Sequence, residues 1–288
     1  MKFKGSWVAL VTPFNVDGSV NYSKFDLLLD FHYKNRTDGL VILGTTGEAS
    51  TINAEEKEKI VDYVVKFNRR RLPIMVGTGS NDTQKVIADS KKFEKMGVDS
   101  ILVVTPYYNK TNHAGLFKHF EMISQAVNLP IVLYNIPSRT GIDIPFSVLE
   151  QLVKLPNISG IKEASGNMSY TMKVATLISN SFELISGNDD IILPILSIGG
   201  SGVISVAANI FPREIHEIVE FFHDGNIIKS QKNQLSLLAM INALFEEVNP
   251  IPVKEMMNLR GFEVGPCRMP LYQMSDDAKS RMIKAFKL

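Results

Sequence analysis

The sequence is short of the features that mark secreted, membrane-spanning and nucleic-acid-binding proteins. A single cysteine among 288 residues excludes an intramolecular disulfide framework and fits a reducing compartment. The formal net charge of +1 gives no indication of a nucleic acid or a membrane surface as a partner. The N-terminus lacks the apolar stretch of a signal peptide, and no apolar run reaches the roughly 18 residues of a membrane span. We therefore expect a cytoplasmic protein.

Recognisable metal and thiol sites are missing as well. Cys267 lies between Gly265-Pro266 and Met269-Pro270, which predict a loop and give no indication of a catalytic thiol. Asp189 and Asp190 could hold a cation, although a role at a helix N-terminus is the first interpretation. The histidines fall in predicted helices without the His-Glu-x-x-His spacing of zinc sites: His32, His113, His119, His216 and His223. We predict no metal site.

What the sequence has instead is a repeating alternation of short apolar runs and helical patterns. Eight runs have the length of strands, at residues 7–11, 40–43, 73–77, 101–104, 130–134, 158–161, 183–186 and 202–205. Helical patterns follow, at residues 22–35, 53–68, 82–96, 113–127, from about 145 and from about 212. Near-continuous apolar strands separated by helices are typical of a parallel sheet covered on its faces. Eight such units predict a (β/α)8 TIM barrel over residues 1–224.

The remainder of the chain, residues 225–288, changes to helical patterns alone. Helices are predicted at about 226–247, 253–259 and 276–287. We interpret this part as a helical C-terminal region packed against the barrel, and not as a second catalytic domain.

One strand of the predicted barrel ends in a lysine, Lys162, in a segment that looks buried. A lysine is rarely buried unless it is paired or chemically employed, and desolvation lowers its pKa toward the range where the amine is nucleophilic. The alternative is a lysine whose long stem lets the ammonium group reach solvent. Barrel enzymes place their active sites at this end of the strands. The other strand ends therefore decide between the two interpretations.

Those strand ends carry Gly44-Thr-Thr-Gly-Glu48, Thr105-Pro-Tyr-Tyr-Asn109, a segment from Tyr134 to Gly141, and Gly187-Asn-Asp-Asp190. Singly, each has an ordinary explanation as a turn, a rim tyrosine or a surface charge. Together they suit imine chemistry, because a desolvated amine condenses with a keto acid and the protonated imine is an electron sink. Tyrosine hydroxyls relayed through a threonine can move the proton. Backbone N–H groups of the glycine-rich turn and an arginine can hold carboxylates.

These motifs resemble the family of pyruvate-dependent class I aldolases and synthases that contains dihydrodipicolinate synthase and N-acetylneuraminate lyase. The resemblance covers nearly the whole chain and extends to Thr12-Pro-Phe14, Gly202-Val-Ile204 and Asn249-Pro-Ile-Pro-Val-Lys254. It implies a barrel with a helical tail, pyruvate as donor substrate, and a covalent Schiff base without a separate cofactor. Pro137-Ser-Arg-Thr-Gly141 favours the synthases, which use L-aspartate-4-semialdehyde in the diaminopimelate and lysine pathway, because the lyases lack this arginine.

The resemblance also assigns roles to individual residues. It implies that Lys162 forms the Schiff base, that Tyr134 gives and takes the proton, and that Thr45 and Tyr108 complete the relay. In the family, the tyrosine that matches Tyr108 reaches in from a neighbouring subunit, so we expect a homo-oligomer, either a dimer or a tetramer. The substrate-binding positions are expected to be Thr46 for the pyruvate carboxylate, Ile204 through its backbone, Arg139 for the semialdehyde, and Gly187.

Feedback regulation is where the sequence departs from the lysine-inhibited members of the family. Their inhibitor pocket contains histidines and an acidic residue at places that hold Ala54, Lys57 and Lys85 here, although Asn81 and Tyr107 are kept. Two lysines would repel a cationic ligand. We predict weak or absent inhibition by lysine.

Three other interpretations stay open at this stage. The first is another family member, a lyase or aldolase that acts on sugar acids such as N-acetylneuraminate or 2-keto-3-deoxy acids. The second is a non-catalytic barrel that binds a keto acid. The third, a phosphate or flavin barrel, is disfavoured because Gly199-Gly-Ser-Gly202 precedes its strand and would lie on the opposite face.

Overall fold

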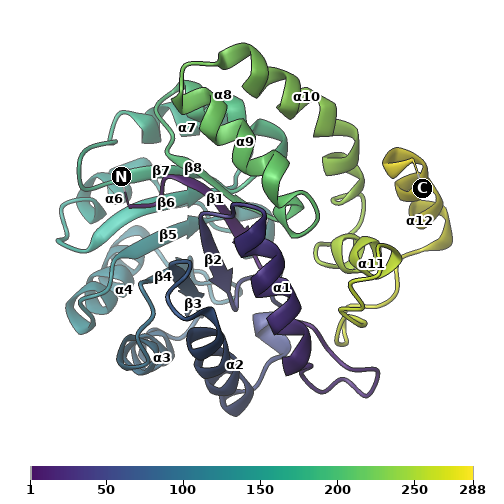
Figure 1. The fold of residues 1–288 in the computed structure, drawn as a ribbon. Coiled ribbons are helices and arrows are strands. Elements are labelled where there is room, and N and C mark those ends of the chain that lie inside the picture. Colours follow the sequence, from purple (N-terminus) through teal and green to yellow (C-terminus); the bar gives the residue numbers. More distant parts are fainter. Residues whose placement is uncertain (1, 288) are drawn as a thin grey trace.

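Eight parallel strands close into a barrel in sequence order in the computed structural model, which describes residues 2–287 (Figure 1). The strands are β1 (Gly5–Ala9), β2 (Gly39–Ile42), β3 (Ile74–Gly77), β4 (Ser100–Val104), β5 (Ile131–Asn135), β6 (Ile158–Glu163), β7 (Glu183–Ser186) and β8 (Gly202–Ser205). Strands β1 and β8 pair and complete the closure. The predicted (β/α)8 TIM barrel is confirmed, and its strands are mostly apolar because both of their faces are covered.

Helices surround the barrel on the outside (Figure 1). They are α1 (Tyr22–Lys34), α2 (Ala54–Asn68), α3 (Thr83–Lys95), α4 (His113–Ala126), α5 (Pro137–Thr140), α6 (Phe146–Leu152), α7 (Met168–Ala175), α8 (Ile192–Ser197) and α9 (Pro212–His223). Short 3-10 turns are η1 (Ala49–Thr51), η2 (Asp189–Ile191) and η3 (Ala207–Asn209). No bounds were predicted for α5, α7 and α8. Helices α5 and α8 span only four and six residues, which hold too few turns for a helical period to be recognised.

The first strand starts and ends two residues earlier than its apolar pattern predicts. Leu10 and Val11 are buried, but they lie beyond β1. The N–H of Val11 donates to the side-chain oxygen of Asn209 at 3.2 Å, and not to a neighbouring strand. The apolar run is therefore longer than the strand, because residues beyond the last strand hydrogen bonds are still buried by the surrounding elements.

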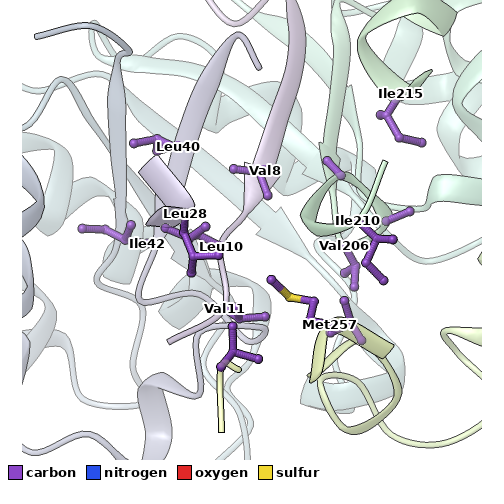
Figure 2. Packing of buried hydrophobic residues seen from close by; sticks show 14 of the residues in the cluster. Val8, Leu10, Val11, Leu28, Leu40, Ile42, Val206, Ile210, Ile215 and Met257 are labelled. Atoms are coloured by element: carbon purple, nitrogen blue, oxygen red, sulfur yellow. The ribbon is translucent and has the colours of Figure 1, made fainter. Parts of the chain in front are cut away.

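Apolar side chains form one layer inside the barrel and another between the strands and the surrounding helices. Inside the barrel, a cluster contains Trp7, Val41, Leu102, Ile185 and Ile204, each from a different strand. Outside, strand residues of the opposite parity pack on the helices, and Figure 2 shows part of one such cluster. That cluster also contains Met257 of helix α11 (Ile251–Leu259), so the C-terminal region shares the packing between the barrel and its helices.

The C-terminal region contains α10 (Ile227–Ala243), α11 and α12 (Asp276–Phe286). Helix α10 packs along α9, and α11 and α12 lie together at one side of the barrel in Figure 1. Three helices are thus found where three were predicted, although α10 ends four residues early, in the turn that leads to Asn249. The division into a barrel of residues 1–224 and a region of residues 225–288 stays a prediction. Within residues 2–287, no helix combines the length and apolar character that crossing a bilayer requires.

Candidate active site

Lys162 lies inside the mouth of the barrel and is 5% exposed. It stands at the penultimate position of β6, directly opposite Tyr134 of β5 in the register of the two strands. Because paired residues of neighbouring strands point to the same face, both side chains enter the barrel. The Lys162 ammonium nitrogen lies 4.3 Å from the centre of the Tyr134 ring. The interpretation of a lysine that reaches solvent is therefore wrong.

A cavity of about 280 Å³ surrounds this lysine. A second cavity, of about 360 Å³, adjoins it, since Thr45, Tyr134, Arg139 and Asn249 line both. Six of the eight predicted site residues line the smaller cavity: Thr45, Thr46, Tyr134, Arg139, Lys162 and Gly187. The structure thus brings together residues from four different strand ends, as expected for the C-terminal face of a barrel.

Tyr108 and Ile204 are the two predicted residues that do not line this cavity. Tyr108 is 91% exposed, in the loop after β4, while its neighbour Tyr107 lines the larger cavity. A contribution of Tyr108 to a neighbouring subunit stays a prediction. Ile204 is 1% exposed and packs in the barrel interior, which leaves its backbone as the group that could contact a ligand.

Only glycine fits at position 187, because the space beside Lys162 leaves no room for a side chain. A β-carbon at this position would stand 2.6 Å from Cβ of Ala164 and 3.1 Å from Cε of Lys162. The backbone N–H of Gly187 donates to the carbonyl oxygen of Glu163 at 2.8 Å, which fixes the chain here. Any larger residue would displace the lysine side chain or its strand.

The threonine turn, which we define as residues 44–48 after β2, presents Thr45 and Thr46 to the cavity. The hydroxyl of Thr12 donates to the carbonyl oxygen of Gly47 at 2.7 Å, and the N–H of Glu48 donates to that of Thr45 at 3.0 Å. Thr46 is 2% exposed, so its hydroxyl is held within the protein. These contacts hold the turn in one conformation.

Asn249, which lies between α10 and α11, connects Thr46 and Arg139, the two positions expected to bind carboxylates. Its side-chain amide donates to the Thr46 hydroxyl at 3.0 Å, and its carbonyl oxygen accepts from the Arg139 guanidinium at 3.0 Å. Asn249 belongs to the family motif Asn249-Pro-Ile-Pro-Val-Lys254, but no role was predicted for it. The only signal was that motif, because contacts between such distant segments cannot be inferred from periodicity.

Two buried carboxyl groups lie close to the lysine in the fold. Burial raises the pKa of Asp189, and the Lys162 charge opposes that rise. One Asp189 oxygen accepts from the N–H groups of Val206 and Ala207 at 3.0 and 2.9 Å, at the start of η3, which confirms the predicted role at a helix N-terminus. Burial also raises the pKa of Glu163, whose carboxylate accepts from Asn135 at 2.8 Å and from Ser165 at 2.6 Å.

The remaining titratable candidates lie away from this cavity. Burial lowers the pKa of His32 to about 3 and that of His119 to about 4, so both rings are neutral inside their helices. Burial raises the pKa of the Cys267 thiol to about 12, which keeps it protonated in its loop. Between residues 2 and 287, no three His, Cys, Asp or Glu side chains are grouped closely enough to hold a metal ion.

The chain is similar to known proteins over nearly its whole length. The model of the dihydrodipicolinate synthetase family matches residues 2–288. The chain belongs to this family. A 4-hydroxy-tetrahydrodipicolinate synthase of Clostridium perfringens (strain SM101 / Type A) is 50% identical over 274 residues, which are 95% of this chain and 94% of that protein. The resemblance inferred from the motifs is therefore confirmed.

Solved structures of dihydrodipicolinate synthases agree with the fold. The structure of the 4-hydroxy-tetrahydrodipicolinate synthase from Methylacidiphilum fumariolicum SolV has a TM-score of 0.97 at 36% identity, and the match covers 99% of this chain and 95% of that one. A dihydrodipicolinate synthase from Cyanidioschyzon merolae, with lysine bound, has a TM-score of 0.96 at 37% identity, covering 99% and 98%. The barrel and its C-terminal helices are thus shared across the family.

Proposed function

We propose that this protein condenses pyruvate with L-aspartate-4-semialdehyde, the reaction of 4-hydroxy-tetrahydrodipicolinate synthases, in the diaminopimelate route to lysine. The observation that carries the proposal is the buried Lys162 beside Tyr134, in a cavity that also contains Thr45 and Arg139. The names of relatives at about half identity support it. No carboxylate among residues 2–287 pairs with Lys162, whereas the other deeply buried lysine, Lys254, is paired with Glu48.

The chemistry follows from the position of the amine. The neutral amine of Lys162 attacks the keto carbon of pyruvate, and the resulting carbinolamine takes up a proton and loses water to give a protonated imine. The methyl carbon then loses a proton and becomes the nucleophilic carbon of an enamine, which forms a bond to the aldehyde carbon. Tyr134 is close enough to take and return protons, with Thr45 as its relay in the same cavity. No separate cofactor is needed in this scheme.

The two substrates carry carboxylates, and the cavity has a place for each. Thr46 and the backbone of the threonine turn suit the pyruvate carboxylate, with the backbone at Ile204 as a further contact. The Arg139 guanidinium donates one N–H to Asn249, and its remaining donors suit the carboxylate of the semialdehyde. Gly187 leaves space for the covalent adduct on Lys162.

The working unit in this proposal is a cytoplasmic homo-oligomer. Tyr108 is 91% exposed within one chain, so a neighbouring subunit is needed if its hydroxyl is to enter a proton relay. A dimer satisfies this requirement, and a tetramer built from two dimers would satisfy it too.

Borohydride trapping tests the proposal directly. Protein incubated with pyruvate and borohydride should gain the mass of one reduced pyruvate per chain, and peptide mapping should place it on Lys162. The Lys162→Ala variant should gain nothing, while Lys173→Ala, which alters a lysine on helix α7, should be labelled like the unaltered protein. An adduct elsewhere, or none, would refute the imine mechanism. Turnover of L-aspartate-4-semialdehyde, compared with that of sugar-acid substrates, then separates the synthase from the lyases.

A further inference from the structure

A fully buried ion pair connects the threonine turn to helix α11. The Lys254 ammonium lies 2.9 Å from Oε1 of Glu48, and the two side chains are 2% and 0% exposed. Lys254 also donates to the carbonyl oxygens of Thr12 at 3.1 Å and Pro266 at 2.7 Å, so all three of its N–H donors are used. The second Glu48 oxygen accepts from the N–H of Arg268 at 2.8 Å. Both charges are therefore compensated.

This pair acts on the backbone that carries the two threonines. Glu48 has a φ of +55°, a left-handed conformation that a non-glycine residue adopts at a cost, and its side chain is anchored in that state by Lys254. Its N–H donates to the carbonyl oxygen of Thr45. A shift of Glu48 would thus be transmitted directly to Thr45.

A second contact reaches the same turn from the same helix. Asn249, 6% exposed and immediately before the N-cap of α11, donates to the hydroxyl of Thr46. The start of α11 therefore holds the turn at two points, through Glu48 and through Thr46. Only the second contact involves a residue expected to bind substrate.

Stability alone is a poor explanation for the ion pair. Buried pairs can often be replaced by well-packed apolar residues without loss of stability, because desolvation of both charges offsets their attraction. The ion pair does fix the position of the threonine turn relative to helix α11, since Lys254 and Glu48 can form their hydrogen bonds in only one such arrangement. Small displacements of reacting groups are costly, with losses of about 100-fold for about 1 Å.

We propose that Lys254 and Asn249 are positioning residues, which hold Thr45 and Thr46 at the distance from Lys162 that imine formation with pyruvate requires. The inference rests on the proposed function. It makes helix α11 a part of the active site, although neither residue is expected to take part in covalent chemistry.

Glu48→Gln and Asn249→Ala test the two contacts separately. Glu48→Gln places an amide nitrogen against Lys254 or against the N–H of Arg268, both of which are donors, so one bond is lost. Asn249→Ala removes the bond to Thr46 and keeps the backbone carbonyl that accepts from Arg139. In both variants, the pyruvate concentration for half-maximal trapping of Lys162 by borohydride should rise on the order of tenfold. The KM for the aldehyde should change much less.

Glu56→Gln is the matched control. Glu56 on α2 bonds the Arg268 guanidinium at 2.8 and 2.5 Å, so the same chemical change is made to a pair that also joins the barrel to the C-terminal region but does not hold the threonine turn. Its melting temperature should fall, while trapping by pyruvate should stay within about twofold of the unaltered protein.

Three outcomes decide the matter. The assignment is overturned if Glu48→Gln and Asn249→Ala melt at lower temperature but trap pyruvate like the control. If Glu48→Gln fails to fold, Asn249→Ala decides alone, because it leaves the ion pair intact. If the unaltered protein forms no adduct, the proposed function itself falls, and the positioning role falls with it.

Discussion

Within residues 2–287, the Arg139 side chain makes one hydrogen bond, and the other N–H groups of its guanidinium are available to a ligand. Its Nη2 donates to the carbonyl oxygen of Asn249, and the side chain lines both cavities. Arg139→Lys keeps the charge but removes the planar fork that binds a carboxylate through two bonds. We expect the KM for the aldehyde to rise on the order of tenfold, equivalent to about 1.4 kcal/mol, with little change in the KM for pyruvate.

Steady-state kinetics with each substrate varied in turn would check this expectation. Arg213→Lys, a conservative change on helix α9, serves as the control and should leave both constants unchanged. If the KM for pyruvate and the KM for the aldehyde rose equally in Arg139→Lys, a selective role of Arg139 in holding the aldehyde would be contradicted.

The neutral, buried ring of His32 makes stability depend on pH. Burial disfavours the charged ring and lowers the pKa of His32 from its ordinary value of 6.5 to about 3 in the folded protein. The unfolded chain therefore binds a proton below pH 6.5 that the folded chain does not, and stability falls as the pH falls through the range from 6.5 to about 3. At pH 5 the loss from this residue is on the order of 2 kcal/mol.

Urea unfolding at pH 7 and pH 5 measures this contribution. His32→Gln, which can keep a bond to Thr37, should be less stable at pH 7 but should lose less stability between the two pH values. The exposed His113→Gln should retain the full pH dependence. The explanation is wrong if His32→Gln shows the same loss between the two pH values as the unaltered protein.

Among the elements, those with long or fully buried patterns were predictable and short ones were not. All eight strands were recognised because helices cover them on the outside, so that apolar residues occupy most positions on both faces. Helix α2 was predicted at residues 53–68, and its start carries a local signal in the sequence, the capping box that the structure contains at Asn53 and Glu56. Helices α5 and α8 escaped recognition, since α5 spans four residues from Pro137 and α8 spans six.

The site residues that lie at strand ends could be predicted from the sequence, and those that lie elsewhere could not. Lys162, Tyr134 and Thr45 each follow or end an apolar run, so the barrel alone predicts that they meet. Asn249 and Lys254 follow no strand, and their contacts with the threonine turn depend on how α11 docks. That docking is set by side-chain packing over a long sequence separation, which no local pattern encodes.

Helices α2 and α3 determine the expected response to lysine. Lys57 of α2 and Lys85 of α3 line the larger cavity together with Tyr107. Burial, followed by the charge of Lys85, lowers the pKa of Lys57, while the carboxylate of Asp89, which lines the same cavity, opposes that shift. We expect lysine to inhibit weakly or not at all in a steady-state assay. Strong inhibition at sub-millimolar lysine would contradict this, and Lys57→Ala with Lys85→Glu should increase any inhibition.

At the scale of the whole molecule, the prediction of shared sites can be tested by mixing inactive chains. Lys162→Ala and Tyr108→Phe should each lower activity strongly when alone. In a mixed dimer, the site that keeps Lys162 receives Tyr108 from its partner, so one of the two sites is restored. Co-expressed at equal amounts, the variants should recover up to about a quarter of the normal activity. Absence of recovery in purified mixed dimers would show that Tyr108 acts within its own chain or not at all.

The ion pair between Glu48 and Lys254 joins residues 206 positions apart. During synthesis, the strand ends that carry Tyr134, Lys162 and the two threonines leave the ribosome well before α11 does. A chain that stops short of Asn249 would contain every residue expected to react but would lack the two contacts that Asn249 and Lys254 make with the threonine turn. If the positioning role holds, a truncated chain would therefore expose Lys162 in a cavity whose threonine turn is not yet held by the C-terminal region.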